Sequence, residues 1–404
     1  MRIAIATASS RRAGGVETYV EQVLASLAAN GHDVALWAES DQPDGVAPIA
    51  LPAGARSVSM AGGADAALAW MPDALIVNGL HDSALESRLL TGLPSVFVAH
   101  NFYGTCISGT KSWAAPVARP CHRVFGAACL LHYFPHRCGG LSPVTMARLY
   151  GRERDRLRHI CAAPSVVTLS AFMREEYLRH GLDPARVTTL PYGPPLHGTP
   201  VYARGPAAVA EPRRLIAIAR LEPIKGMHLL LDALPLVQQS LTRAIALTVL
   251  GDGSQRERLE IQARRVAAAS PGVTVEFAGW TSPLERDRHL RRADLLIVPS
   301  TWPEPLGLVG IEAARAGVPA AAFDVGGISE WLKNGVTGVT APGDPPTAGR
   351  LARAIVSCLE DDRRLEALGR AAQQHSVRLT PDTHVAGLLA LLTRVRADVH
   401  PGLD

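Results

Sequence analysis

Short apolar runs alternate along the chain with longer segments in which apolar residues recur at helical spacing. Short runs rich in Val, Ile, Leu and Ala are typical of strands that are buried on both faces of a parallel sheet. The runs lie at 2–8, 33–38, 74–77, 95–99, 166–169, 187–190, 215–219, 246–250, 273–277, 295–298 and 320–323. Helical patterns lie at 82–90, 144–160, 172–180 and 227–237. This alternation predicts an α/β protein with doubly wound parallel sheets.

Length and a proline-rich stretch predict two domains. A chain of 404 residues is too long for one ordinary core, because single cores stop growing at about 250–300 residues. Prolines cluster with Gly and Ala between Gly193 and Pro212, which is typical of a hinge. We therefore predict a first domain over 1–198 and a second over 199–379. A C-terminal helix over 380–404 is predicted to pack back on the first domain.

The stretch from Pro299 to Ala316 predicts a strand end, a loop and the start of a helix. Prolines cannot donate ladder hydrogen bonds, so the chain must leave the sheet after the apolar run. Apolar residues recur at helical spacing from Gly307 onward. Free N–H groups at a helix start, at the carboxyl edge of a parallel sheet, favour phosphate. Glu304 precedes this helix and Glu312 lies within it, so both can approach one ligand from different sides.

Two carboxylates beside a phosphate site would repel the phosphate unless they bind hydroxyl groups instead. A nucleotide-sugar carries such hydroxyls on its ribose and on its hexose, and carboxylates accept hydrogen bonds from both. The alternative is that Glu304 and Glu312 are ordinary carboxylates that complement the dipole at a helix start.

Loops after other predicted strands add cations and glycines. Arg220 and Lys225 follow a strand and precede a helix, an arrangement that favours a diphosphate. Gly253 follows the strand at 246–250. Gly14 and Gly15 follow the first strand, but the loop is longer than a dinucleotide-binding turn and lacks its third glycine. A nicotinamide-dependent enzyme is therefore disfavoured.

His100 follows the strand at 95–99, where an open sheet binds its ligands, although a structural histidine is the alternative. The segment 105–142 is predicted to be an irregular insert that contacts substrate. The insert holds Cys106, Cys121, Cys129 and Cys138, with His122, His132 and His136 between them. No close Cys-x-x-Cys pair occurs, so we expect structural thiols, with a zinc site as the minority alternative.

Arginines recur every four residues at 148, 152 and 156, and further arginines lie at 119, 123 and 137. They predict either a basic face for an anionic or lipid-linked acceptor, or an ordinary solvated helix face. The net charge of +4 is well short of that of a nucleic-acid-binding protein. No signal-like N-terminus and no long apolar run occur. We therefore expect a cytoplasmic protein, with peripheral contact at the inner face of an anionic membrane left open.

These residues, in this order, resemble the family-four retaining glycosyltransferases of the GT-B fold over nearly the whole chain. The resemblance implies two Rossmann-like domains facing a cleft, with the nucleotide-sugar in the second domain. Arg220 and Lys225 would neutralise the diphosphate, Glu312 would bind the ribose and Glu304 the donor sugar. His100 would lie near the reacting sugar. The remaining donor-binding positions implied are Gly14, Gly15, Gly253, Leu306, Gly307 and Leu308.

The resemblance also implies retention of the anomeric configuration, with the departing phosphate helping to deprotonate the acceptor hydroxyl. Neither a metal nor a cofactor is expected, because no Asp-x-Asp motif occurs and the two cations take the place of a metal. The expected donor is a hexose on a nucleoside diphosphate such as UDP or GDP. The expected acceptor is a glycan, a lipid-linked sugar or a small molecule.

Two alternatives stay open. A nucleotide-sugar epimerase of the same architecture would form its product without an acceptor, but the insert at 105–142 favours an acceptor. A catalytically silent carbohydrate-binding protein would not need both cations and both glutamates.

Overall fold

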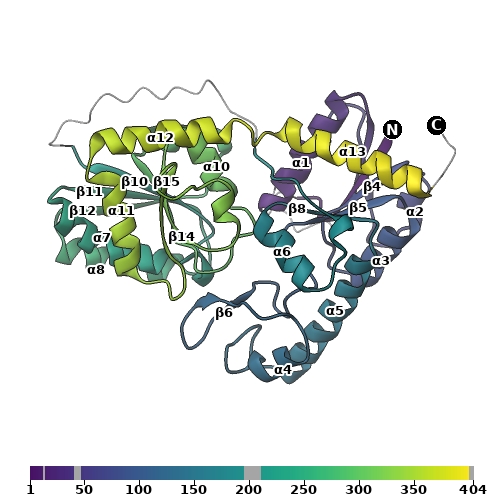
Figure 1. Cartoon of the computed structure of the whole chain (residues 1–404), viewed down its shortest axis with the longest axis horizontal. Helices are drawn as coiled ribbons and strands as arrows, with labels where there is room; N and C mark the ends of the chain where they lie inside the picture. Colours follow the sequence, from purple (N-terminus) through teal and green to yellow (C-terminus); the bar gives the residue numbers. More distant parts are fainter. Residues whose placement is uncertain (12–13, 41–46, 195–210, 400–404) are drawn as a thin grey trace. The chain divides into compact units, whose positions relative to one another are not determined.

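The computed structural model describes residues 1–11, 14–40, 47–194 and 211–399 (Figure 1). The chain forms two compact units. The first comprises Met1–Lys111, His122–Pro195 and Leu379–Asp404, and the second comprises Ser112–Cys121 and Leu196–Arg378. The predicted domain boundary at 198/199, and most of the predicted hinge, lie outside the described residues.

The first unit contains a seven-stranded sheet in which every pairing is parallel. Its strand order is β3-β2-β1-β4-β5-β8-β9. The strands are β1 (Arg2–Ser9), β2 (Asp33–Ser40), β3 (Arg56–Ser59), β4 (Ala74–Val77), β5 (Ser95–Ala99), β8 (Ser165–Thr168) and β9 (Val187–Thr189). The strand order reverses between β1 and β4, so ligands are expected at the carboxyl ends of these strands.

The helices of the first unit connect and cover this sheet. They are α1 (Gly15–Ala29), α2 (Asp65–Leu68), α3 (Ser83–Gly92), α4 (Ala128–Tyr133), α5 (Pro143–Ala162), α6 (Ala171–Arg179) and α13 (Pro381–Val399), with a 3-10 turn η1 (Pro184–Arg186). The C-terminal helix α13 packs against α1, and Figure 1 shows the two side by side. Val385, Leu388, Leu392 and Val395 are its buried stripe at helical spacing. The prediction that this helix joins the first domain is confirmed.

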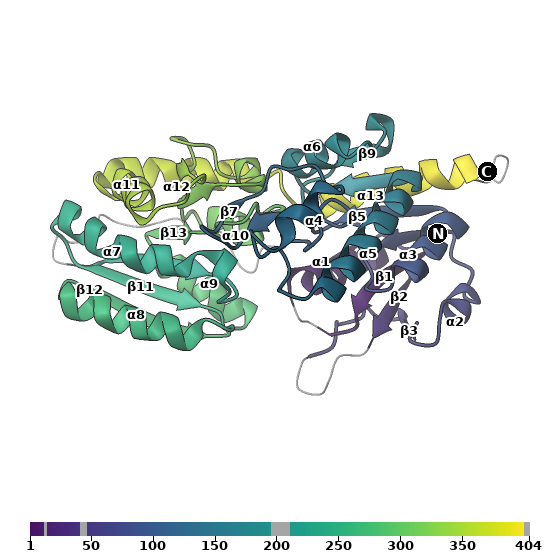
Figure 2. The same cartoon turned by 90° about the horizontal axis from the view of Figure 1, so that it is seen from below.

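The second unit contains a six-stranded sheet, again parallel in every pairing, in the order β12-β11-β10-β13-β14-β15. The strands are β10 (Arg213–Ile218), β11 (Ile245–Leu250), β12 (Val273–Gly279), β13 (Leu295–Val298), β14 (Ala320–Asp324) and β15 (Gly338–Pro342). The order reverses between β10 and β13, and helices lie on both sides of the sheet (Figure 2). The prediction of two doubly wound parallel sheets is therefore confirmed.

Two groups of helices flank the second sheet. The helices are α7 (Met227–Leu241), α8 (Arg256–Ala269), α9 (Pro283–Arg292), α10 (Leu308–Arg315), α11 (Ala348–Leu359) and α12 (Asp362–Ser376), with 3-10 turns η2 (Pro223–Lys225) and η3 (Gly327–Glu330). Helix α7 packs against α8 and α11, whereas α10 packs against α12. A capping box of Ser282 and Glu285 starts α9. None of the described helices has both the length and the apolarity that crossing a membrane requires.

The insert at 105–142 is more ordered than the sequence predicts. It contains an antiparallel hairpin, β6 (Ser112–Trp113) with β7 (Arg119–Pro120), and the short helix α4. The hairpin groups with the second unit, although the sequence assigned the whole insert to the first domain. The rest of the insert has a small core of Ile107, Phe125 and Tyr133, against which Cys129 and Cys138 pack. The sequence does not indicate α4, because the helix is short and has no side-chain cap.

Candidate active site

Lys225 and Glu304 form a close ion pair at the carboxyl edge of the second sheet. Lys225 ends the turn after β10 and Glu304 lies in the loop after β13, and these two strands are neighbours. The Lys225 Nζ atom lies 2.6 Å from Glu304 Oε1, with the two side chains 14% and 9% exposed. The sheet order thus brings together two predicted site residues that are far apart in sequence.

The surroundings of this pair keep the Glu304 carboxylate charged and fixed. Burial disfavours the charge, but Lys225 and a hydrogen bond from the Ser300 hydroxyl outweigh it and lower the pKa of Glu304. The Lys225 ammonium lies 4.8 Å from the centre of the Trp302 ring, within the range of a cation–π interaction. Sequence reasoning missed Ser300 and Trp302, although both lie in the stretch that it singled out.

Two glycines let neighbouring loops pack directly against the backbone on either side of Glu304. Gly226 has a φ of +67°, and a Cβ atom there would lie 1.9 Å from the Pro299 carbonyl oxygen. Gly326 has a φ of +62°, and a Cβ atom there would lie 2.3 Å from the Glu304 carbonyl oxygen. Larger residues would be strained and would clash at both positions. The loop that carries Glu304 is therefore held from two sides.

Glu312 lies in the first turns of α10 and is less completely paired than Glu304. Its Oε1 atom lies 2.9 Å from a guanidinium nitrogen of Arg286 on α9. Its Oε2 atom is buried and has no hydrogen-bond partner among the described residues. Burial raises the pKa of Glu312 to about 6, against the opposing charge of Arg286. Sequence reasoning missed Arg286, because the arginine-rich sequence of α9 singles out no member as a carboxylate partner.

The start of α10 has no side-chain cap on its N–H groups. Gly307 precedes the helix with a φ of +83°. The Leu306 carbonyl accepts a hydrogen bond of 2.7 Å from Trp331 Nε1, which fixes the approach to Leu308. A helix start of this kind favours an anionic group.

Arg220 and Gly253 lie on the loops after β10 and β11. The Arg220 side chain is exposed and has no ion-pair partner in the described part of the chain. A Cβ atom at Gly253 would lie 2.8 Å from the Leu221 backbone, so the two loops pack closely. The structure thus gathers Arg220, Gly253 and the Lys225–Glu304 pair at one edge of the second sheet.

His100 lies in the first unit, at the carboxyl end of β5, and is 8% exposed. Its Nε2 atom lies 2.9 Å from Asn78 Oδ1, and Asn78 follows β4. Burial, together with the nearby His384, lowers the pKa of His100 to about 3, so the ring is neutral near pH 7. Sequence reasoning missed Asn78, although it follows a strand end in the same way as His100.

An aromatic cluster connects His100 to the C-terminal helix. Tyr19 on α1 makes an edge contact with His100, with 4.6 Å between the ring centres. The Tyr19 hydroxyl lies 2.7 Å from Nε2 of His384 on α13. Gly14 and Gly15 stand at the start of α1, which has no side-chain cap. The helix that carries Tyr19 therefore also presents the glycine loop.

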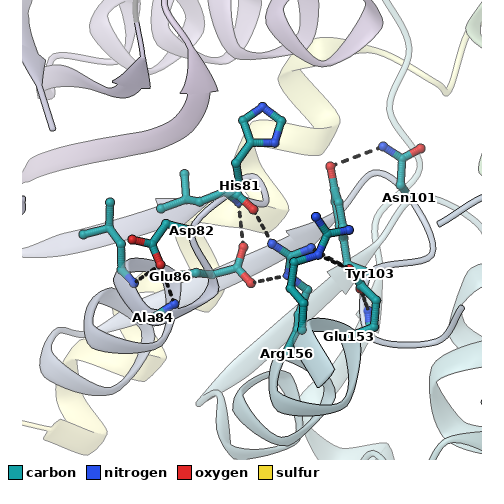
Figure 3. A network of polar contacts seen from close by, with 12 residues as sticks. His81, Asp82, Ala84, Glu86, Asn101, Tyr103, Glu153 and Arg156 are labelled. Carbon is teal, nitrogen blue, oxygen red and sulfur yellow. Dashed lines mark hydrogen bonds and ion pairs between the residues drawn. The ribbon is translucent and has the colours of Figure 1, made fainter. Parts of the chain in front are cut away.

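The three arginines of α5 do not form one exposed face. Arg156 is 3% exposed and donates to Glu86 at 2.9 Å and to Glu153 at 3.4 Å (Figure 3). Arg152 is 39% exposed and pairs with Glu153 at 2.8 Å. Neither predicted role of the stripe applies to Arg156, because Glu86 on α3 is its partner and α3 packs against α5.

The same network braces the loops after β4 and β5. Glu86 accepts from the Leu80 backbone N–H at 2.7 Å, and Glu153 accepts from that of Gly104 at 2.9 Å. The Arg156 guanidinium lies 4.9 Å from the centre of the Tyr103 ring (Figure 3). Arg156 therefore helps to position the loops that carry Asn78 and His100.

None of the insert's cysteines forms a disulfide within the described residues. Within the described ranges, no group of three or more His, Cys, Asp or Glu residues is arranged to hold a metal ion. The packing of Cys129 and Cys138 in the insert core is what structural thiols would show.

Comparison with protein families matches both halves of the chain. Residues 14–193 match the family described as "Glycosyl transferase 4-like domain", and residues 203–375 match "Glycosyl transferases group 1". A glycogen synthase of Mycobacterium tuberculosis is 31% identical over 390 residues, which covers 91% of this chain and 87% of that protein. A GDP-mannose-dependent phosphatidylinositol monomannoside mannosyltransferase of the same species is 30% identical over 276 residues, covering 62% of this chain and 69% of that protein.

Solved structures match over nearly the whole chain. The sucrose-phosphate synthase of Thermosynechococcus elongatus has a TM-score of 0.72 at 20% identity and covers 98% of this chain and 100% of that one. The Anabaena protein HepE in complex with UDP and glucose has a TM-score of 0.68 at 18% identity, covering 96% and 99% of the two chains. At these identities the likeness shows the fold.

Proposed function

The chain belongs to the family-four glycosyltransferases of the GT-B fold, which transfer a glycosyl group from a nucleotide-sugar, and from this premise we propose its chemistry. We propose that it moves a hexosyl group to an acceptor hydroxyl with retention of configuration and without a metal ion. The observation that carries this proposal is the Lys225–Glu304 pair, 2.6 Å apart, beside the uncapped start of α10. Two cations and an open helix start suit a leaving diphosphate, and the carboxylates suit sugar hydroxyls.

Charge on the leaving diphosphate is neutralised by side chains rather than by a metal. Arg220 offers an exposed guanidinium, and Lys225 offers an ammonium held in place by Glu304 and the Trp302 ring. Fixed cations at the point where negative charge develops lower the barrier without reorganisation. The open N–H groups of Leu308 and its neighbours at the start of α10 add to this effect.

The two glutamates bind different sugars of the donor. Glu312 has one carboxylate oxygen without a partner among the described residues, which suits the ribose hydroxyls. The Glu304 carboxylate is held by Lys225 and Ser300, and Gly326 packs against the Glu304 backbone; a fixed carboxylate suits the transferred hexose. Glu304 then stabilises the positive charge that the hexose gains in the transition state.

Retention follows when the acceptor attacks from the face that the diphosphate leaves. The bond between the anomeric carbon and the diphosphate oxygen breaks, and a bond from that carbon to the acceptor oxygen forms. The acceptor proton passes to the departing phosphate. His100, neutral and held by Asn78, hydrogen-bonds a hydroxyl of the reacting sugar. The protein contributes by positioning and by electrostatic stabilisation.

The donor's nucleotide and sugar are to be found by screening. One relative's name specifies GDP-mannose, and one structural neighbour holds UDP and glucose, so UDP- and GDP-hexoses are the first donors to test. The acceptor that we propose is a glycan or a lipid-linked sugar. A lipid-linked acceptor would be consistent with a peripheral location of the protein at a membrane.

The test is a screen of donors in the presence of EDTA. The protein is incubated with UDP-glucose, UDP-galactose, GDP-mannose or ADP-glucose and a set of sugar and glycolipid acceptors, and release of the nucleoside diphosphate is measured. We expect one donor to be consumed at a rate that EDTA does not change. Loss of activity in EDTA that Mn²⁺ restores would contradict metal independence.

The product's anomeric proton then tests retention. An α-linked donor should give an α-linked product by ¹H NMR, and a β-linked product would overturn the stereochemical proposal. Conversion of the donor into an epimer in the absence of any acceptor would instead support the epimerase alternative.

A further inference from the structure

An uninterrupted stretch of the chain lacks acidic residues. No Asp or Glu occurs between Glu86 and Glu153, although the whole chain contains 37 of them in 404 residues. The stretch does contain Lys and Arg, and it includes α4 and the first half of α5. This stretch, which belongs to the first unit except for the hairpin residues Ser112–Cys121, therefore has a positive local charge on a chain that is nearly neutral overall.

Large apolar side chains are exposed at the end of this region. Leu131 and Phe134, at and just after the end of α4, are 78% and 37% exposed. Leu141 and Val144, at the start of α5, are 71% and 78% exposed. Helices α4 and α5 are in contact, and Figure 1 shows α4 beside the start of α5, away from the end of α5 that leads to β8. We call residues 123–148 the α4–α5 tip.

These apolar residues are not an unfinished part of the core. The inward side of α4 is already packed, because Cys129, Leu130 and Tyr133 contribute to the insert core with Leu149 and Tyr150 of α5. Leu131 and Phe134 are three positions apart and lie on one side of the helix. Exposed apolar side chains that gather in one place mark a binding surface.

The tip also carries exposed cations. Arg123, Arg137 and Arg148 are exposed, and none has an ion-pair partner among the described residues. Arg123 stands two residues before Phe125, which packs with Tyr133 of α4 in the insert core, so the Arg123 backbone lies near α4. His132 stacks on His136 with 5.4 Å between the ring centres. The tip therefore combines cations and apolar groups with no carboxylate among its residues.

The tip is firmly attached to the rest of the unit. Lys111, 2% exposed, forms a buried ion pair with Glu176 of α6 and donates to the Thr105 carbonyl at 3.1 Å. The Phe125 backbone N–H donates at 2.8 Å to Nε2 of His180, the residue that follows α6. At the other end, Arg156 ties α5 to α3. The exposed apolar side chains are thus carried by a part of the chain that is tied to both α6 and α3.

We propose that the α4–α5 tip docks the protein on an anionic lipid surface. Leu131, Phe134, Leu141 and Val144 would enter the boundary between head groups and acyl chains, while Arg123, Arg137 and Arg148 bind anionic head groups. A soluble anionic glycan would pair with the arginines but would leave the aliphatic side chains in water. The combination therefore favours a membrane over a polysaccharide. The surface differs from the α5 arginine stripe, because Arg156 is buried.

The test is flotation of the purified chain with vesicles at low salt. Vesicles of phosphatidylcholine with phosphatidylglycerol are compared with vesicles of phosphatidylcholine alone. We expect binding only to the anionic vesicles, and weaker binding as salt is added. Equal recovery with the two kinds of vesicle, or no recovery with either, would overturn the proposal. The result does not depend on catalysis, so failure of the proposed function would leave it unaffected.

Two triple variants separate the two contributions. Removing the cations in Arg123→Gln, Arg137→Gln and Arg148→Gln should weaken binding about 100-fold, at about fivefold for each arginine near an anionic surface. Removing the apolar groups in Leu131→Ser, Leu141→Ser and Val144→Ser should also release the protein. Matched controls at exposed positions of the second unit are Leu284→Ser, Val336→Ser and Val377→Ser, and Arg288→Gln, Arg353→Gln and Arg363→Gln.

The controls should bind vesicles as the unsubstituted protein does, and all variants should keep their thermal unfolding midpoints. Vesicle binding by either tip variant at the unsubstituted level would overturn the proposal. Binding to soluble dextran sulfate is measured in parallel. A different outcome is that the protein prefers dextran sulfate to vesicles, with the arginine variant losing this binding and the serine variant keeping it. That result would instead assign the tip to an anionic glycan.

Discussion

At the scale of single residues, the two glutamates of the site have opposite environments. Lys225 and Ser300 outweigh burial and lower the pKa of Glu304, whereas burial raises the pKa of Glu312 to about 6. Near pH 7 both are carboxylates, but only Glu312 would be protonated by moderate acid. The two residues can therefore be separated by pH as well as by mutation.

We expect affinity for the nucleoside diphosphate to fall below about pH 6 through Glu312. In the proposed complex the ribose hydroxyls donate to the Glu312 carboxylate, so protonation of this group, whose pKa is raised, removes the acceptor as the pH falls through about 6. The decrease should approach tenfold per pH unit below the pKa. Titration calorimetry between pH 5 and pH 8 measures it.

The phosphate of the ligand titrates in the same range, so Glu312→Gln is the necessary control. That variant should bind more weakly and should retain only the pH dependence that comes from the ligand. Identical pH profiles for the unsubstituted protein and Glu312→Gln would contradict the role of this carboxylate.

The Lys225–Glu304 pair should be strongly coupled in stability. Lys225→Met should lower the free energy of unfolding by about 3 kcal/mol, because it leaves a buried carboxylate without its cation. Lys225→Met combined with Glu304→Gln should recover part of this loss. Denaturant unfolding of the two single variants and the double variant gives the coupling energy. Additive losses would show that the pair does not interact in the folded protein.

At the scale of elements, apolar runs predicted the central strands well, because strands buried on both faces leave a continuous signal in the sequence. The run at 295–298 coincides with β13. The pattern did not indicate β15, which begins at Gly338, ends at Pro342 and is only partly buried. Nor did it show that Arg156 is buried, because its partner Glu86 lies on another helix.

The candidate site was predictable only in part. Glu304, Glu312, Lys225 and Arg220 stand at strand ends or helix starts, positions that local sequence reveals. The pairings of Lys225 with Glu304 and of Arg286 with Glu312 depend on the order of strands and helices in space. Local spacing carries no information about such long-range contacts.

Two arginines of α5 should differ sharply in their contribution to stability. Arg156→Ala should lower the free energy of unfolding by about 3–4 kcal/mol, because Glu86 and Glu153 lose a buried partner. Arg148→Ala on the same helix is the matched control and should change it by less than about 0.5 kcal/mol. Urea unfolding of both variants measures the difference. Similar losses for the two would mean that the Arg156 network adds nothing to stability.

The C-terminal helix should make stability depend on pH. Burial lowers the pKa of His100 to about 3 and that of His384 on α13 to about 4. In the unfolded chain both histidines have the ordinary pKa of 6.5, so below that pH the unfolded state binds more protons than the folded state. Each histidine should lower the free energy of unfolding by about 2 kcal/mol as the pH falls from 7 to 5. Unfolding free energies should therefore fall with acid, and His384→Gln should reduce the slope. An unchanged slope in that variant would contradict the assignment.

At the scale of the whole molecule, the second unit carries both glutamates and both cations that we propose for the donor site. The first unit carries His100 and the Gly14–Gly15 loop, and α13 returns the end of the chain to it. The account therefore requires that nucleotide binding be a property of the second unit and that Glu304 act on the transferred sugar rather than on the nucleotide.

Calorimetric titration of the better of UDP and GDP into the unsubstituted protein, Glu312→Ala and Glu304→Ala tests this most directly, with donor turnover measured alongside. Glu312→Ala should weaken nucleotide binding by about 1.5–3 kcal/mol, the range for a charge-assisted pair of hydrogen bonds. Glu304→Ala should bind the nucleotide almost as the unsubstituted protein does and yet lose turnover of the intact donor. If both variants bound the nucleotide equally poorly, with equal losses of turnover, the separate roles of the two glutamates would be wrong.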